Sequence, residues 1–216
     1  MTPGFPSIAE LHQLAGALTP LRNFAMKRLT AGPANGGTPV RGYLTLMEDA
    51  GRLNVSSDGE AAVAFRRRFN GYYAVRRNEA WRRIFYRQFE LGKAYVGPPE
   101  VLFKDVLGKI HRATQRVEAS FASKLVASIH PKSPVIDSVV RTFLTEHLEA
   151  SPDPKGMQGA LNFYGWLNQV MAELSTTQQA ADWFAEFNER FSDEPGAAEI
   201  TDMKKLDFLI WGGARR

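Results

Sequence analysis

The sequence predicts an all-helical protein. In most segments apolar residues recur three and four positions apart, the spacing of one helix face, as Trp81, Ile84, Phe85 and Phe89 do. Stretches rich in proline and glycine separate these segments, and no two segments show the alternation and tight turn of a strand hairpin. A chain of 216 residues, 44% hydrophobic and 23% charged, is typical of a single folded domain, residues 1–216.

The first helix is predicted from a capping box. Ser7 precedes Glu10 by three residues, so each side chain can satisfy a backbone N–H at the helix start. We expect a helix over residues 8–28, broken by a proline. Residues 31–39 contain so many turn formers that we expect a loop and a subdomain junction there. The segment 40–55 fits either a short hairpin or a helix.

Helical periodicity then continues to the end of the chain. Four helices are predicted in the middle, over residues 60–70, 74–91, 102–111 and 118–129. Turn formers at residues 151–156 indicate a second subdomain junction. Further helices are expected over residues 136–147, 157–172 and 176–190, with a last one capped by Thr201 or Asp202 and stopped at Gly212 and Gly213.

The composition excludes several classes of protein and site. The chain has no cysteine, which excludes disulfides, cysteine-ligated zinc, iron–sulfur clusters and thiol catalysis. No apolar run reaches the roughly 18 residues of a membrane helix, and the N-terminus lacks a signal-peptide pattern, so we expect a cytoplasmic protein without membrane association. Four scattered histidines disfavour a metal site. No phosphate loop or serine elbow is present, and no cofactor is indicated.

Positive charge is concentrated in the first two thirds of the chain. Residues 1–133 hold 20 Lys and Arg against 10 Asp and Glu, whereas residues 134–216 hold 7 against 13. Within residues 66–93, nine basic residues meet only two acidic ones, and eight of the nine are arginine. Because the arginine fork binds phosphate bidentately, this pattern favours a polyanion-binding surface over a solvated helix face, which normally mixes charge signs.

One aspartate stands at a helix–loop–helix junction. Asp137 follows the proline-bounded loop after residue 130 and precedes the next predicted helix. Its carboxylate can cap that helix by accepting from free backbone N–H groups. Alternatively, the same carboxylate stays ionised at the mouth of a cleft, where it stabilises a developing cation or orients a water.

The junction resembles that of a known family. Val135-Ile136-Asp137-Ser138-Val139-Val140 is similar to the apolar-apolar-Asp-x-x-Val motif of the helix-hairpin-helix superfamily of DNA glycosylases, and the resemblance covers about residues 115–145. It implies two helical subdomains that enclose a cleft, duplex DNA with a modified base as partner, and extrusion of the target nucleotide. Asp137 would stabilise cation character on the sugar and assist a water during base excision.

The resemblance also implies roles for other residues. The family's hairpin glycines are missing from residues 115–120, and no lysine lies where the lyase members place their nucleophile. We therefore expect a monofunctional enzyme, with Lys124 as a second catalytic candidate or an ordinary exposed helix residue. The residues implied for DNA phosphates are Arg76, Arg77, Arg82, Arg83, Arg87 and Lys132. Those implied for a base pocket, if they are not core residues, are Phe121, His130, Tyr164 and Trp166.

Two other classes of function fit the same sequence. One is a noncatalytic helical module that binds DNA or RNA, in which Asp137 is only a helix cap. The other is a protein-interaction domain whose basic face docks an acidic partner, including the acidic C-terminal part of another copy.

Overall fold

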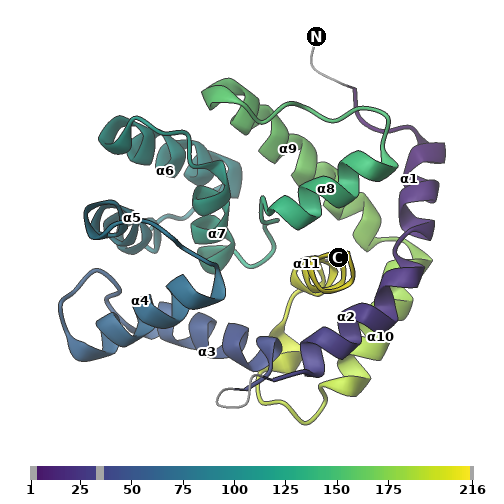
Figure 1. Cartoon of the computed structure of the whole chain (residues 1–216), viewed down its shortest axis with the longest axis horizontal. Helices are drawn as coiled ribbons and strands as arrows, with labels where there is room; N and C mark the ends of the chain where they lie inside the picture. The colour runs from purple at the N-terminus through teal and green to yellow at the C-terminus, as the bar shows by residue number, and fades with distance from the viewer. Residues whose placement is uncertain (1–3, 33–36, 215–216) are drawn as a thin grey trace.

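The structure is a computed structural model that describes residues 4–32 and 37–214, and over these residues it contains helices and no strands (Figure 1). This confirms the predicted all-helical class. The α-helices are α1 (Ile8–Gly16), α2 (Arg22–Thr30), α3 (Pro39–Arg52), α4 (Glu60–Tyr72), α5 (Glu79–Gly92), α6 (Pro99–Thr114), α7 (Ala119–Ile129), α8 (Ser138–His147), α9 (Gly156–Ser175), α10 (Gln178–Arg190) and α11 (Asp202–Gly213). Two short 3-10 helices are η1 (Thr19–Leu21) and η2 (Ala197–Glu199).

The N-terminal elements follow the sequence signals closely. Ser7 and Glu10 form the predicted capping box, with the Ser7 N–H donating to Glu10 Oε2 at 2.8 Å. The predicted break falls at η1, between α1 and α2. The ambiguous segment 40–55 is helical as far as Arg52, because Thr38 caps α3 and a proline occupies its first position. Residues 33–36 of the predicted loop lie outside the described residues.

The α4–α5 connection is longer than predicted. We expected a helix from residue 74, but α5 begins at Glu79, where the Asn78 side chain caps it by accepting from the Trp81 N–H at 3.0 Å. Ala74 has a φ of +51°, in the left-handed region that ends helices. The Val75 N–H closes this turn on the Asn70 carbonyl at 2.8 Å.

The helices surround α11. In Figure 1, α3 to α7 lie on one side, α1, α2 and α8 to α10 lie on the other, and α11 stands between them. Leu206, Leu209 and Ile210 of α11 are completely buried. Gly212 allows α11 to approach α2 closely, because a Cβ there would lie 3.0 Å from the Ala25 Cα. The loop between α7 and α8 crosses from one side to the other (Figure 1).

Among the described residues, no helix combines the length and the apolar character that a membrane span requires.

Candidate functional site: a lysine cavity beside an arginine groove

A cavity of about 420 Å³ lies where α3, α4, α7, α8 and α11 meet. It is called the Lys124 cavity below. Part of its wall is aromatic, and four ionisable side chains border it in two lysine–aspartate pairs. The aromatic and ionisable residues are Tyr72, Tyr73, Phe208, Trp211, Lys124, Asp137, Lys204 and Asp207.

Lys124 projects from the middle of α7 into this cavity. The residue is only 7% exposed, and its Nζ lies 3.7 Å from Asp137 Oδ2 and 3.4 Å from the Tyr73 carbonyl oxygen. The ammonium also stands 5.5 Å from the centre of the Phe121 ring. The expectation of an ordinary exposed lysine is therefore wrong, because α7 is buried along the turn that carries Lys124.

Burial lowers the pKa of the Lys124 amine, since the low-dielectric surroundings disfavour the charged form. The carboxylates of Asp137 and Asp207 act in the opposite direction but do not cancel the effect of burial. A lowered pKa leaves more of the lysine as the neutral amine, which is the nucleophilic form.

Asp137 caps the N-terminus of α8 and also faces Lys124. It is the N-cap of α8, and its Oδ1 accepts a hydrogen bond from the Val139 N–H at 2.9 Å. Its other oxygen, Oδ2, faces the Lys124 ammonium. The sequence left two placements open for Asp137, a helix cap and a carboxylate that faces a cavity. In the structure one carboxylate oxygen caps α8, and the other faces Lys124 in the cavity.

The second pair, Lys204 and Asp207 of α11, was missed by the sequence analysis. Both residues are less than a tenth exposed, and Lys204 Nζ lies 2.6 Å from Asp207 Oδ2. Burial acts to lower the pKa of Lys204, but Asp207, Tyr72 and Tyr43 outweigh it and raise that pKa above its usual value. The sequence signal was available, because these charges interrupt a segment that is otherwise apolar.

An arginine groove of about 860 Å³ runs between α4 and α5. Its basic residues are Arg66, Arg67, Arg82, Arg83 and Arg87, and its acidic residues are Asp58 and Glu79. Arg83 pairs with Glu79 at 2.6 Å. The Arg66 guanidinium donates to backbone carbonyls.

Three arginines of the groove have side chains without a hydrogen-bond or ion-pair partner among the described residues. The side chains of Arg67, Arg82 and Arg87 make no hydrogen bond or ion pair with any residue in the described part of the chain. The groove and the Lys124 cavity share no lining residue, but both reach the C-terminal half of α4, where Asn70 lines the groove and the next residue, Gly71, lines the cavity.

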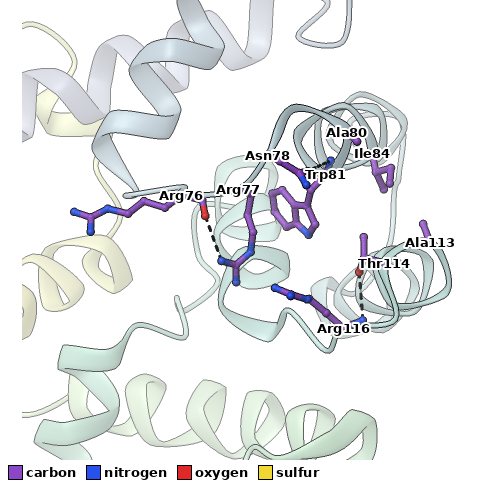
Figure 2. Close-up of a pocket in the computed structure, with 9 residues that line it drawn as sticks. All are labelled: Arg76, Arg77, Asn78, Ala80, Trp81, Ile84, Ala113, Thr114 and Arg116. Atoms are coloured by element: carbon purple, nitrogen blue, oxygen red, sulfur yellow. Dashed lines mark hydrogen bonds between the residues drawn. The ribbon is translucent and has the colours of Figure 1, made fainter.

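The other predicted phosphate-binding residues lie elsewhere. Arg76 and Arg77 border a separate pocket around Trp81 (Figure 2). Lys132 is exposed in the loop between α7 and α8 and lines neither the cavity nor the groove. The arginine-rich segment therefore divides between two surfaces, because Arg76 and Arg77 lie in the connection before α5. Arg82, Arg83 and Arg87 lie on α5 itself and line the groove.

The four predicted base-pocket residues do not line the Lys124 cavity. Tyr164 and Trp166 of α9 are buried in the core, where Tyr164 stacks on Phe103 with ring centres 3.9 Å apart. His130 packs edge-on against Tyr95. Phe121 is half-buried and lies beneath the Lys124 ammonium, so among the four it alone contacts a predicted catalytic residue.

Within residues 4–32 and 37–214, no group of three or more histidine and carboxylate side chains is arranged to hold a metal ion. Comparisons of the chain with models of protein families, with curated proteins and with solved structures find no match.

Proposed function

We propose that this protein is a DNA glycosylase that uses Lys124 and Asp137 to release a base from duplex DNA. The observation that carries the proposal is the 3.7 Å approach of Lys124 Nζ to Asp137 Oδ2 at the wall of an aromatic-lined cavity. A buried amine beside a carboxylate is typical of sites that perform nucleophilic chemistry. The resemblance of residues 135–140 to the glycosylase motif supports the same chemistry.

Lys124 would act as the nucleophile. The neutral amine attacks C1′ of the extruded nucleotide, and the C1′–N bond breaks with its electron pair leaving on the base, which takes up a proton. The attached nitrogen loses one proton, which balances the proton taken up by the base. The C1′–O4′ bond then breaks with its electron pair leaving on O4′, the second N–H proton is transferred to O4′, and an imine remains between Nζ and C1′. This step departs from the monofunctional mechanism expected from the sequence, and the reason is the position of Lys124 at the cavity.

Asp137 would act by electrostatics. Its carboxylate is held by the α8 N-terminus through the Val139 N–H, so it is already oriented before a substrate arrives. Positive charge develops on the sugar as the C1′–N bond breaks, and a fixed carboxylate nearby stabilises that charge. Removal of one such preorganised group commonly costs on the order of 10²–10³ in rate.

The arginine groove would hold the DNA backbone. Five arginines and two carboxylates line it, and residues in the C-terminal half of α4 line both the groove and the Lys124 cavity. Arginine forks bind phosphate oxygens bidentately, and phosphate contacts supply most of the affinity for duplex DNA. A duplex in the groove would bring an extruded nucleotide toward the cavity.

The test uses a duplex with one natural abasic site, which requires no knowledge of the base. The open-chain abasic sugar presents an aldehyde at C1′, which condenses with the Lys124 amine and releases water. Borohydride then delivers a hydride to the imine carbon and leaves a stable amine cross-link. We expect the wild-type protein to cross-link, Lys124→Gln to lose the cross-link, and Lys155→Gln to behave as the wild type.

Affinity for duplexes with and without an abasic-site analogue, measured across a salt series, separates the other outcomes. Tighter binding to the analogue without any cross-link would favour the monofunctional mechanism, in which Asp137 assists a water. Equal binding to both duplexes would favour a noncatalytic nucleic-acid-binding module. No binding to either at low salt would overturn the proposal and favour a protein-interaction domain.

A further inference from the structure

A second pocket, of about 430 Å³, lies between the start of α5 and the end of α6. It is called the Trp81 pocket below. Arg77, Asn78 and Trp81 border it from the α5 side, and Thr114 and Arg116 border it from the α6 side. Figure 2 shows Arg77 and Arg116 flanking the Trp81 ring, whereas Arg76 is directed away from it.

Trp81 brings an unsatisfied donor to this pocket. The residue is 6% exposed, and its Nε1–H has no hydrogen-bond partner among the described residues. The ring is held rigidly, stacked on Phe85 at 5.3 Å and edge-on to Phe121 at 4.9 Å. In Figure 2 the indole nitrogen faces Thr114 and Arg116. Five other buried polar atoms of the described residues also lack a partner, but Trp81 differs from them in lining this pocket, so a ligand that accepts a hydrogen bond there would satisfy its donor.

The positive charges around the pocket favour a negatively charged hydrogen-bond acceptor. Arg77 is engaged by Glu118, with two guanidinium–carboxylate contacts of 3.0 Å. Arg116 is exposed, and its side chain makes no hydrogen bond or ion pair within the described part of the chain. The α5 N-terminus adds the partial positive charge of its free amides, although Asn78 already accepts from the Trp81 backbone N–H. The pocket is therefore cationic and rich in donors.

We propose that the Trp81 pocket binds a phosphate group of the DNA backbone, with Trp81 Nε1–H and the Arg116 guanidinium as its donors. This inference rests on the proposed function for the identity of the DNA, but the phosphate site itself does not. A phosphate oxygen accepts from an indole N–H, and the guanidinium fork complements its charge.

Phe121 links this pocket to the Lys124 cavity. The Arg77 guanidinium carbon lies 5.1 Å from the Phe121 ring centre, and Lys124 Nζ lies 5.5 Å from the same centre. The two cations share one ring, and successive phosphates of one strand are separated by about 3.4 Å along the helix axis. A phosphate at Trp81 and Arg116 would belong to a nucleotide close to the extruded one, which suits a contact that sets the register of the strand.

The experiment has two arms and one matched control. In the first arm, tryptophan fluorescence is titrated with inorganic phosphate in the wild type, Trp81→Phe and Arg116→Ala. In the second arm, affinity for an undamaged duplex is measured across a salt series. The control is Arg112→Ala, which removes an exposed arginine one helical turn away that does not line the pocket.

We expect phosphate to change the fluorescence of the wild type and of Arg112→Ala, and not that of Trp81→Phe. Arg116→Ala should weaken phosphate binding at least tenfold. It should also reduce the magnitude of the slope of log affinity for DNA against log salt by about 1, the effect of one lost phosphate contact.

The phosphate titration and the DNA salt series test different parts of the proposal, so each can contradict it independently of the other. A phosphate response without any effect of Arg116→Ala on the DNA slope would overturn the DNA backbone as the source and assign the pocket to a free phosphate or a phosphorylated small molecule. No response to phosphate, together with equal DNA slopes for Arg116→Ala and Arg112→Ala, would overturn the site. If the wild type binds no DNA, the proposed function fails and so does the assignment to DNA, while the phosphate arm still decides whether the pocket binds an anion.

Discussion

The Ser123 hydroxyl accepts a hydrogen bond from the Ile136 N–H at 2.9 Å. Ser123 precedes Lys124 in α7, and Ile136 precedes Asp137 at the start of α8, so this bond joins the neighbours of both proposed catalytic residues. The bond is buried, and the Ser123 hydroxyl donates in turn to the Ser120 carbonyl. Ser123 thus fixes the distance between the helix that carries the lysine and the loop that carries the aspartate.

Substitution of Ser123 with alanine leaves the buried Ile136 N–H without an acceptor. We expect the free energy of unfolding to fall by about 1–3 kcal/mol. Urea unfolding measures the change, and Ser138→Ala, at an exposed position one residue beyond Asp137, is the control. Equal stability of the two variants would contradict the role assigned to Ser123.

Replacing Asp137 with asparagine and with alanine distinguishes its contribution as a helix cap from the contribution of its negative charge. Asparagine caps a helix about as well as aspartate, and both variants leave Lys124 without its carboxylate partner, so the free energy of unfolding of Asp137→Ala should be about 1 kcal/mol lower than that of Asp137→Asn. Both variants remove the carboxylate and should slow base release on the order of 10²–10³. Unimpaired release by a folded Asp137→Asn protein would show that Asp137 serves only as a cap.

The pKa of Lys124 is open to direct measurement. Because burial lowers it, reductive methylation of Lys124 with formaldehyde should follow a pH midpoint below 10.5, the value of an unperturbed lysine. Asp137→Asn should move the midpoint lower still, since Asp137 favours the charged amine. Peptide mass spectrometry reads the labelling, and Lys155, whose side chain is 90% exposed, reports the reagent's activity in each sample. A midpoint at or above 10.5 would remove the electrostatic argument for a nucleophilic amine.

The Lys204–Asp207 pair should be sensitive to the loss of one partner. Asp207→Asn leaves a buried ammonium without its counter-charge, and breaking such pairs costs about 3–5 kcal/mol. The double variant Lys204→Met with Asp207→Asn removes the stranded charge and should recover much of that loss. A double-mutant cycle by thermal and urea unfolding measures the coupling, and additive losses would mean that the two side chains act independently.

Two helix glycines should respond in opposite directions to alanine. At Gly213 a methyl group would clash with Leu21 of η1, so Gly213→Ala should destabilise the protein by about 1–3 kcal/mol. At Gly165 of α9 nothing lies within 4 Å of the added Cβ, and Gly165→Ala should stabilise by about 0.5–1 kcal/mol. Unfolding midpoints of the two variants provide the comparison. An unchanged midpoint for Gly213→Ala would show that the end of α11 can shift away from η1.

The helix boundaries and the positions of the site residues depended on different kinds of information. Ser7 with Glu10, Thr177 and Thr201 cap helices through contacts within three residues, which is why local sequence located those starts within a residue or two. The start of α5 was predicted five residues too early. Ala74 adopts a left-handed conformation, which is rare for alanine and which the local sequence does not indicate.

By itself, the sequence determined the helical class, the excess of arginine in the first two thirds, and Asp137 as the residue at the start of α8, because all three depend on composition or local spacing. Tertiary structure alone decided which charges meet. Lys124 reaches Asp137 because the α7–α8 loop folds back, and Lys204 and Asp207 join them because α11, some 70 residues further on, packs between the two groups of helices. Contacts between residues far apart in the chain depend on packing, and helical periodicity carries no information about which faces will meet.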